Sequence, residues 1–144
     1  MFLREMVLLG KNGSKEIFQD FGEIIARYLK NFSDYYLTFV PLTSKKRLQR
    51  GFNQSEVLAQ AIAKSLNLKI FNGLIKIKET KDQTELNSEQ RLTNLTGAFA
   101  LKEKPPRKVI LIDDIKTTGA TLKECARTLK NGGTKEIIAL TILK

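Results

Sequence analysis

Residues 109–122 constrain the fold more than any other part of the 144-residue sequence. The segment opens with four consecutive aliphatic residues, Val109 to Ile112. An unbroken aliphatic run is typical of a strand buried on both faces, the usual state of a central strand in a parallel sheet. Asp113 and Asp114 stand where this strand is expected to end, and a helical pattern begins at about Thr121. The segment therefore predicts an α/β fold with a strand–loop–helix unit at its centre.

The loop between the acidic pair and the helix has the composition of a phosphate site. The first N–H groups of a helix lack intrahelical partners and carry the positive end of the helix dipole, so they attract anions. Glycine permits a tight turn, and threonine hydroxyls add hydrogen-bond donors. We therefore expect the loop to hold a 5-phosphate through Thr117, Thr118, Gly119, Ala120 and Thr121.

The acidic pair suits another part of the same ligand. Carboxylates repel a phosphate, but they accept hydrogen bonds from sugar hydroxyls and hold Mg²⁺ directly or through water. Asp113 and Asp114 are thus predicted to bind a ribose diol and Mg²⁺, which makes a ribose 5-phosphate the expected ligand. The alternative is an ordinary strand-to-helix turn in which Asp and Thr act as caps.

The run VILIDDIKTTGAT resembles the signature with which type I phosphoribosyltransferases bind 5-phosphoribosyl 1-pyrophosphate (PRPP). The resemblance implies a type I phosphoribosyltransferase-like, three-layer α/β fold. Its twisted, mostly parallel sheet would carry helices on both faces and bind ligand at the C-terminal ends of the strands. Lys116 departs from the signature, because relatives often have an apolar or aromatic residue there.

A second informative segment is strongly basic and follows a predicted strand at residues 37–42. Dense positive charge at a strand-to-helix loop suits pyrophosphate, and the residues expected to bind it are Thr43, Ser44, Lys45, Lys46, Arg47 and Arg50. A solvated basic loop is the alternative. The adjoining words RGFNQSEVLAQAIAK resemble the competence protein F (ComF) family of phosphoribosyltransferase-like proteins.

The resemblance extends into a polar segment without periodicity. Thr80, Gln83 and Leu86 match a T-x-x-Q-x-x-L pattern of that family, and residues 91–99 match R-x-x-N-x-x-G-A-F. In type I enzymes this region is a flexible loop that closes over PRPP. The resemblance therefore implies a lid that includes Lys78, Thr80, Gln83 and Arg91, whereas composition alone allows an ordinary surface loop.

The remaining elements are predicted from periodicity. A helix is expected from Ser14 to about Asn31, with its core face formed by Ile17, Phe21, Ile24, Ile25 and Tyr28. Further helices are expected at 55–66 and 121–131, short strands at 68–77 and a final strand at 137–143. Cys125 falls on the apolar side of its helix, so we expect a core residue and no reactive thiol.

Composition sets the limits of this interpretation. We expect one domain over residues 1–144, with no membrane-spanning run and a cytoplasmic location. One cysteine and no histidine exclude a disulfide framework and the usual zinc sites. Many ComF relatives carry an N-terminal four-cysteine zinc ribbon, so this chain is either a short member or a truncated one. The formal charge of +10 fits an anionic ligand and also nucleic acid.

The resemblance implies binding of Mg-PRPP and transfer of the 5-phosphoribosyl group to a nitrogen acceptor with release of pyrophosphate. No residue identifies the acceptor, and ComF relatives are linked to DNA uptake in natural transformation. Two other functions therefore stay open: a non-catalytic PRPP sensor and a protein that handles single-stranded DNA. A homodimer or a competence-protein partner also stays open. Trp is absent and only Phe52 adjoins the basic segment, so we expect any DNA binding to be weak.

Overall fold

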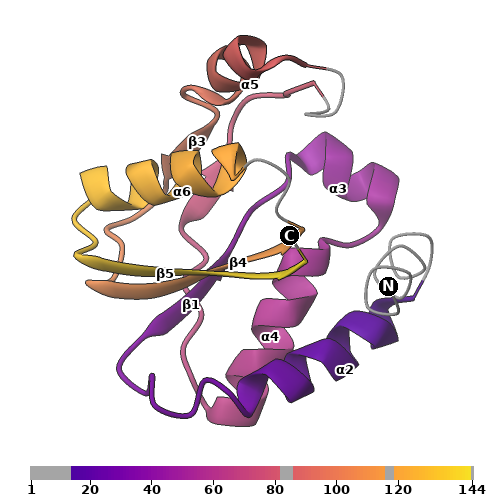
Figure 1. The fold of residues 1–144 in the computed structure, drawn as a ribbon, viewed down its shortest axis with the longest axis vertical. Coiled ribbons are helices and arrows are strands. Elements are labelled where there is room, and N and C mark those ends of the chain that lie inside the picture. The colour runs from indigo at the N-terminus through magenta and orange to yellow at the C-terminus, as the bar shows by residue number, and fades with distance from the viewer. Residues whose placement is uncertain (1–13, 82–85, 116–118, 144) are drawn as a thin grey trace.

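A three-stranded parallel sheet with the order β1–β4–β5 organises the protein (Figure 1). The computed structural model describes residues 14–81, 86–115 and 119–143. The strands are β1 (Tyr36–Phe39), β4 (Lys108–Ile115) and β5 (Glu136–Leu143), and β4 lies between the other two. A separate antiparallel pair joins β2 (Leu74–Lys76) to β3 (Phe99–Leu101). The predicted α/β class and the parallel pairing around the central strand are confirmed.

Helices cover both faces of the sheet, as Figure 1 shows. Two of them, α2 (Lys15–Ala26) and α4 (Gln54–Leu66), form one layer, and α6 (Ala120–Asn131) lies on the opposite face. The central strand supplies both cores because its side chains alternate. Ile110 and Ile112 pack in the cluster with α2 and α4, whereas Val109 and Leu111 pack in the cluster with α6. All four are at most 1% exposed, which confirms the strand buried on both faces.

Two shorter helices lie where loops were expected. The basic segment forms α3 (Ser44–Arg50), because the Thr43 side chain accepts a hydrogen bond from Lys46 N and caps the first turn. Helix α3 escaped prediction because its one apolar residue, Leu48, is 85% exposed and leaves no apolar stripe. The end of the predicted lid forms α5 (Ser88–Leu95), which begins with reciprocal bonds between Asn87 and Gln90.

Several predicted bounds were wrong. The first helix ends at Ala26, well before Asn31, and the first strand covers 36–39 instead of 37–42. The central strand continues to Ile115, so the acidic pair lies within the end of β4 and not after it. The expected start of α6, the last strand and the buried Cys125 are confirmed. None of the described helices is long and apolar enough to cross a membrane.

The core face of α2 was also predicted partly wrongly. Phe21 is buried, but Ile24 is 50% exposed and Tyr28 is 81% exposed. The face is rotated because Gly22 lies directly against α4: a Cβ atom on Gly22 would stand 2.4 Å from Ala61 Cβ. The glycine lets the two helices approach closely, so the residues beside it, and not the larger Ile24, form the contact. Tyr28 is exposed because it lies beyond the end of α2.

Gly22→Ala is therefore expected to lower the free energy of unfolding by about 1–3 kcal/mol, because the added methyl group overpacks the α2–α4 contact. Urea denaturation monitored by circular dichroism measures this. The compensating double variant Gly22→Ala with Ala61→Gly should recover part of the loss. A Gly22→Ala variant as stable as the wild type would contradict the close approach of the two helices.

Candidate functional site

The acidic pair lies at the C-terminal end of β4, against the first turn of α4. Asp113 Oδ1 accepts two hydrogen bonds, from Ser55 Oγ at 3.1 Å and from Asp114 N at 2.9 Å. Burial, and secondly the charge of the Asp114 carboxylate, raise the pKa of Asp113 to about 7. Two adjacent, largely buried carboxylates cost stability, and such an arrangement is more common in functional sites than in purely structural ones.

The N-terminus of α6 follows the acidic pair closely in sequence. Gly119, the N-cap residue, is buried and has φ 79° and ψ 3°, in the left-handed region that glycine adopts without strain. This backbone requirement accounts for glycine at that position. Ala120 and Thr121 form the first turn of the helix and are partly exposed. Lys116, Thr117 and Thr118 lie outside the described residues.

The basic residues predicted to bind pyrophosphate lie on α3 and not in a loop. Thr43 is buried and caps the helix, whereas Ser44, Lys45, Arg47 and Arg50 are exposed and Lys46 is partly buried. Arg47 Nη1 pairs with Glu56 Oε2 of α4 at 2.6 Å, so Arg47 already has a counter-charge. The helix stands near the C-terminal ends of β4 and β5, as Figure 1 shows.

Lys76, at the end of β2, is a residue that the sequence did not single out. Partial burial and the nearby charges of Lys46 and, less strongly, Arg50 lower its pKa. Lys76 therefore stands within electrostatic range of Lys46 and Arg50 on α3. Lys76 also lines a cavity of about 340 Å³ together with Arg47, Asn53 and Lys102. Its only sequence signal is its position two residues before the predicted lid.

The structure describes part of the predicted lid, residues 78–81 and 86–91. Lys78 is exposed, and Thr80 Oγ1 accepts a hydrogen bond from Lys76 Nζ at 2.7 Å. The backbone of Arg91 lies in α5, and Gln83 lies outside the described residues. Asn94 ties the segment together, because its side chain bonds both Lys81 N and Lys81 O at 3.1 Å. Residues 78–81 thus form no helix or strand, whereas the end of the predicted lid lies in α5; whether the segment closes over a ligand stays a prediction.

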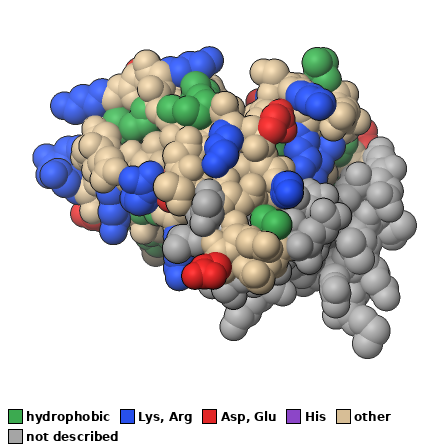
Figure 2. Space-filling model, turned by 90° about the horizontal axis from the view of Figure 1, so that it is seen from above, with side chains coloured by type: hydrophobic (Ala, Val, Ile, Leu, Met, Phe, Trp, Pro, Cys, Tyr) green, Lys and Arg blue, Asp and Glu red, His purple; other side chains and the backbone are tan. Residues whose placement is uncertain are grey.

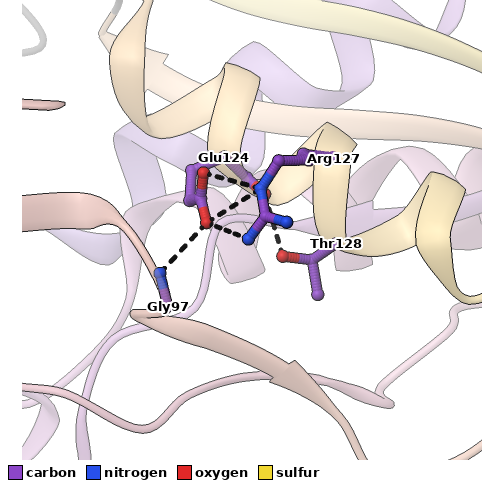
Figure 3. A network of polar contacts seen from close by, with 4 residues as sticks. All are labelled: Gly97, Glu124, Arg127 and Thr128. Carbon is purple, nitrogen blue, oxygen red and sulfur yellow. Dashed lines mark hydrogen bonds and ion pairs between the residues drawn. The ribbon is translucent and has the colours of Figure 1, made fainter.

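The returning end of this segment is attached to α6 (Figure 3). Glu124 on α6 accepts a hydrogen bond from Gly97 N at 3.2 Å and from Arg127 Nη2 at 2.6 Å. The Arg127 guanidinium lowers the pKa of Glu124, which keeps the carboxylate charged. Through Glu124, the turn after α5 is fixed to α6, the helix that follows the predicted phosphate loop.

The donor set at the acidic pair fits Mg²⁺. This ion prefers oxygen ligands and is commonly bound by one or two carboxylates together with substrate phosphates and water. Asp113 and Asp114 supply such carboxylates, although no group of three or more His, Cys, Asp or Glu ligands occurs among the described residues.

Figure 2, a view from the end that carries α5 and α3, shows many more Lys and Arg than Asp and Glu side chains.

Comparison with protein families decides how this arrangement is classified. The profile of the phosphoribosyl transferase domain matches residues 52–144, which include α4, the acidic pair and α6. The chain belongs to this family. The match covers more than half of the chain. It contains α4, which begins within the RGFNQSE motif, and the VILIDDIKTTGAT signature; the family was predicted from these two motifs.

Curated relatives confirm the resemblance to competence protein F. Competence protein F of Haemophilus influenzae is 38% identical over 103 residues, covering 68% of this chain and 45% of that protein. Competence protein ComFC of Streptococcus pneumoniae is 29% identical, with 86% and 54% covered. The DNA utilization protein YhgH of Salmonella typhi is 37% identical, with 65% and 42% covered. The chain thus spans about half the length of these relatives.

Solved structures agree on the fold. A hypoxanthine phosphoribosyltransferase from Staphylococcus aureus superposes with a TM-score of 0.53 in one crystal form and 0.56 in another. The superposition covers 91% of this chain and 65% of that one at 17–18% identity. At this identity the likeness confirms the phosphoribosyltransferase-like fold alone.

Proposed function

We propose that the protein binds Mg-PRPP, or a related ribose 5-phosphate, at the C-terminal end of the parallel sheet. One observation carries the proposal. A partly buried acidic pair lies near the end of β4, and a left-handed glycine opens α6 five residues after Asp114. Along the chain, carboxylates that accept hydrogen bonds from hydroxyl groups are thus followed by helix N–H groups that donate to a phosphate. A ribose 5-phosphate presents its hydroxyl groups and its phosphate in the same order.

The residues then take separate roles. Asp113 and Asp114 accept hydrogen bonds from the ribose hydroxyls, and residues 117–121 hold the 5-phosphate. The cations Lys46 and Arg50 of α3 and Lys76 of β2 are assigned to the pyrophosphate. When bound, Mg²⁺ at the acidic pair would neutralise charge on the pyrophosphate oxygens. Family membership supports the assignment, because a phosphoribosyl transferase domain acts on ligands of this class.

The reaction we propose is transfer of the 5-phosphoribosyl group. A nitrogen lone pair of the acceptor forms the bond to ribose C1, while the bond from C1 to the pyrophosphate oxygen breaks. Pyrophosphate leaves with that electron pair, and the acceptor nitrogen releases its proton. The cations near Lys76 stabilise the charge that builds up on the leaving group. A closed lid at residues 78–91 excludes water, which would otherwise hydrolyse PRPP.

Thermal denaturation and a pyrophosphate assay together test this proposal. PRPP with Mg²⁺ should raise the midpoint of unfolding, because a ligand that binds only the folded state stabilises it. A transferase should also release pyrophosphate when nitrogen acceptors, including nucleobases, are added. Stabilisation without release for any acceptor would identify the non-catalytic PRPP sensor. The proposal fails if neither PRPP nor ribose 5-phosphate stabilises the protein.

A second function, the handling of single-stranded DNA, is favoured by the names of the relatives and by exposed cations on α3. Aromatic side chains on which bases could stack are scarce there, since Phe52 is the one that adjoins α3 and it is only partly exposed. We therefore expect weak binding that falls steeply with salt and that Mg-PRPP displaces. Fluorescence anisotropy of labelled single-stranded DNA across a salt series measures it. Tight, salt-resistant binding that ignores Mg-PRPP would make DNA the main ligand.

A further inference from the structure

A buried chain of hydrogen bonds joins three separate elements at the proposed site. Asn53 Nδ2 donates to the Val40 carbonyl oxygen at 3.0 Å, just beyond the end of β1. Asn53 Oδ1 accepts from Ser55 N at 3.1 Å at the start of α4. Ser55 Oγ then donates to Asp113 Oδ1 at 3.1 Å at the end of β4. The chain thus connects the strand that leads into α3 with the acidic pair.

The burial of these groups makes the arrangement rigid. Asn53 is 4% exposed and Ser55 is 3% exposed, so water cannot easily replace their bonds. Ser55 Oγ and Asp114 N donate to the same oxygen of Asp113, Oδ1. Two donors on one oxygen hold the carboxylate plane in a single orientation. The first turn of α4, which contains Ser55, also presents the positive end of its dipole to the carboxylate.

We propose that Ser55 is a positioning residue, which fixes Asp113 Oδ1 so that Oδ2 is directed to the ribose hydroxyls. The inference rests on the proposed function, because it assigns Asp113 to the ribose. Asn53 completes the device by tying Ser55 to the end of β1. The ribose part and the pyrophosphate part of the site are thereby held at one spacing.

The test compares two ligands on one series of variants. Ser55→Ala should weaken PRPP binding about tenfold, because a hydrogen bond to a charged group is lost and the carboxylate can rotate. Binding of pyrophosphate measured without Mg²⁺ should change less than twofold, since pyrophosphate lacks the ribose and no metal then joins it to the acidic pair. Isothermal titration calorimetry measures both dissociation constants. Ser55→Cys, with a weak donor of similar size, should bind PRPP with intermediate affinity, and Ser55→Thr, which keeps the hydroxyl, should recover most of it.

Thr134→Val is the matched control. Thr134 is 3% exposed, and its Oγ1 donates to the Pro106 carbonyl oxygen at 2.8 Å near the opposite edge of the sheet. The control loses a buried hydroxyl bond as Ser55→Ala does, so it should lower stability similarly but leave both affinities unchanged. Equal losses for PRPP and pyrophosphate in Ser55→Ala would overturn the positioning role and indicate general disruption. Unchanged PRPP affinity in Ser55→Ala would overturn it while leaving the proposed function intact. Wild-type protein that binds no ribose phosphate would overturn both.

Discussion

Replacing Asp113 and Asp114 together by asparagine is expected to weaken PRPP binding at least a hundredfold. Each carboxylate is assigned to the ribose hydroxyls, and hydrogen bonds to charged groups are worth about 1.5–3 kcal/mol each. The direction of the change in PRPP affinity identifies its cause. Removing two negative charges beside an anionic ligand would by electrostatics alone tighten binding. A large loss of affinity can therefore come only from specific contacts to the ribose or to its Mg²⁺.

Isothermal titration calorimetry of this double variant against Mg-PRPP provides the measurement. Asp20→Asn with Asp34→Asn is the matched control, because both residues are exposed and the double variant likewise removes two negative charges. The control should bind PRPP as the wild type does, or slightly better. If the Asp113 and Asp114 variant keeps wild-type affinity, the acidic pair does not contact the ligand.

The single variant Asp113→Asn should at the same time be more stable than the wild type at pH 8 without magnesium. In the folded protein the pKa of Asp113 is raised from 3.8 to about 7, so the folded state binds this proton more tightly than the unfolded chain. Wild-type stability contributed by this group is therefore lost as the pH rises from about 4 to about 7. Asparagine carries no charge, so the variant does not lose this stability. Its free energy of unfolding should exceed that of the wild type by about 1 kcal/mol or more at pH 8 and should differ little at pH 4.

Gly119→Ala is expected to weaken PRPP binding at least tenfold, with only about 1 kcal/mol lost in stability. Gly119 has φ 79° at the N-cap of α6, where a side chain is strained. Relief of that strain would move the backbone N–H groups that are proposed to hold the 5-phosphate. Affinity for ribose 5-phosphate and PRPP should fall together, since both carry the 5-phosphate.

Gly133→Ala is the matched control for the glycine variant. Gly133 has φ 118°, and an added Cβ there would meet nothing within 4 Å. It lies between α6 and β5, at the end of α6 remote from its first turn. Thermal denaturation should show a comparable loss of stability for both variants, and calorimetry should show lost affinity for Gly119→Ala alone. Equal affinities in the two variants would remove the phosphate from this loop.

The part of the site that lies within one continuous segment could be predicted from the sequence. An aliphatic run, an acidic pair and a glycine before a helix each have a local cause, so β4 and the start of α6 were predicted to within a few residues. Helix α3 could not be predicted in this way, because it lacks an apolar stripe. The Thr43 cap and the Arg47–Glu56 ion pair hold it in place instead.

Contacts between distant residues account for the rest of what was missed. Ser55 and Asp113 are 58 positions apart, and Lys76 meets the charges of α3 only through the fold. A signal for Ser55 did exist, since it lies within the RGFNQSE motif, but the motif does not say which atom it contacts. The exposed Ile24 shows the same limit, because the close approach at Gly22 sets the rotation of α2.

A nuclear magnetic resonance titration of the isotopically labelled wild-type protein with Mg-PRPP tests the central claim most directly. We predict that backbone amide shifts change at residues 113–121 and at Ser44–Arg50, saturate together, and do not change near Lys108 and Glu136 at the opposite edge of the sheet. Ribose 5-phosphate should reproduce the changes at 113–121 alone. The absence of any shift change, or changes confined to the opposite edge, would contradict a ribose phosphate site at the end of β4.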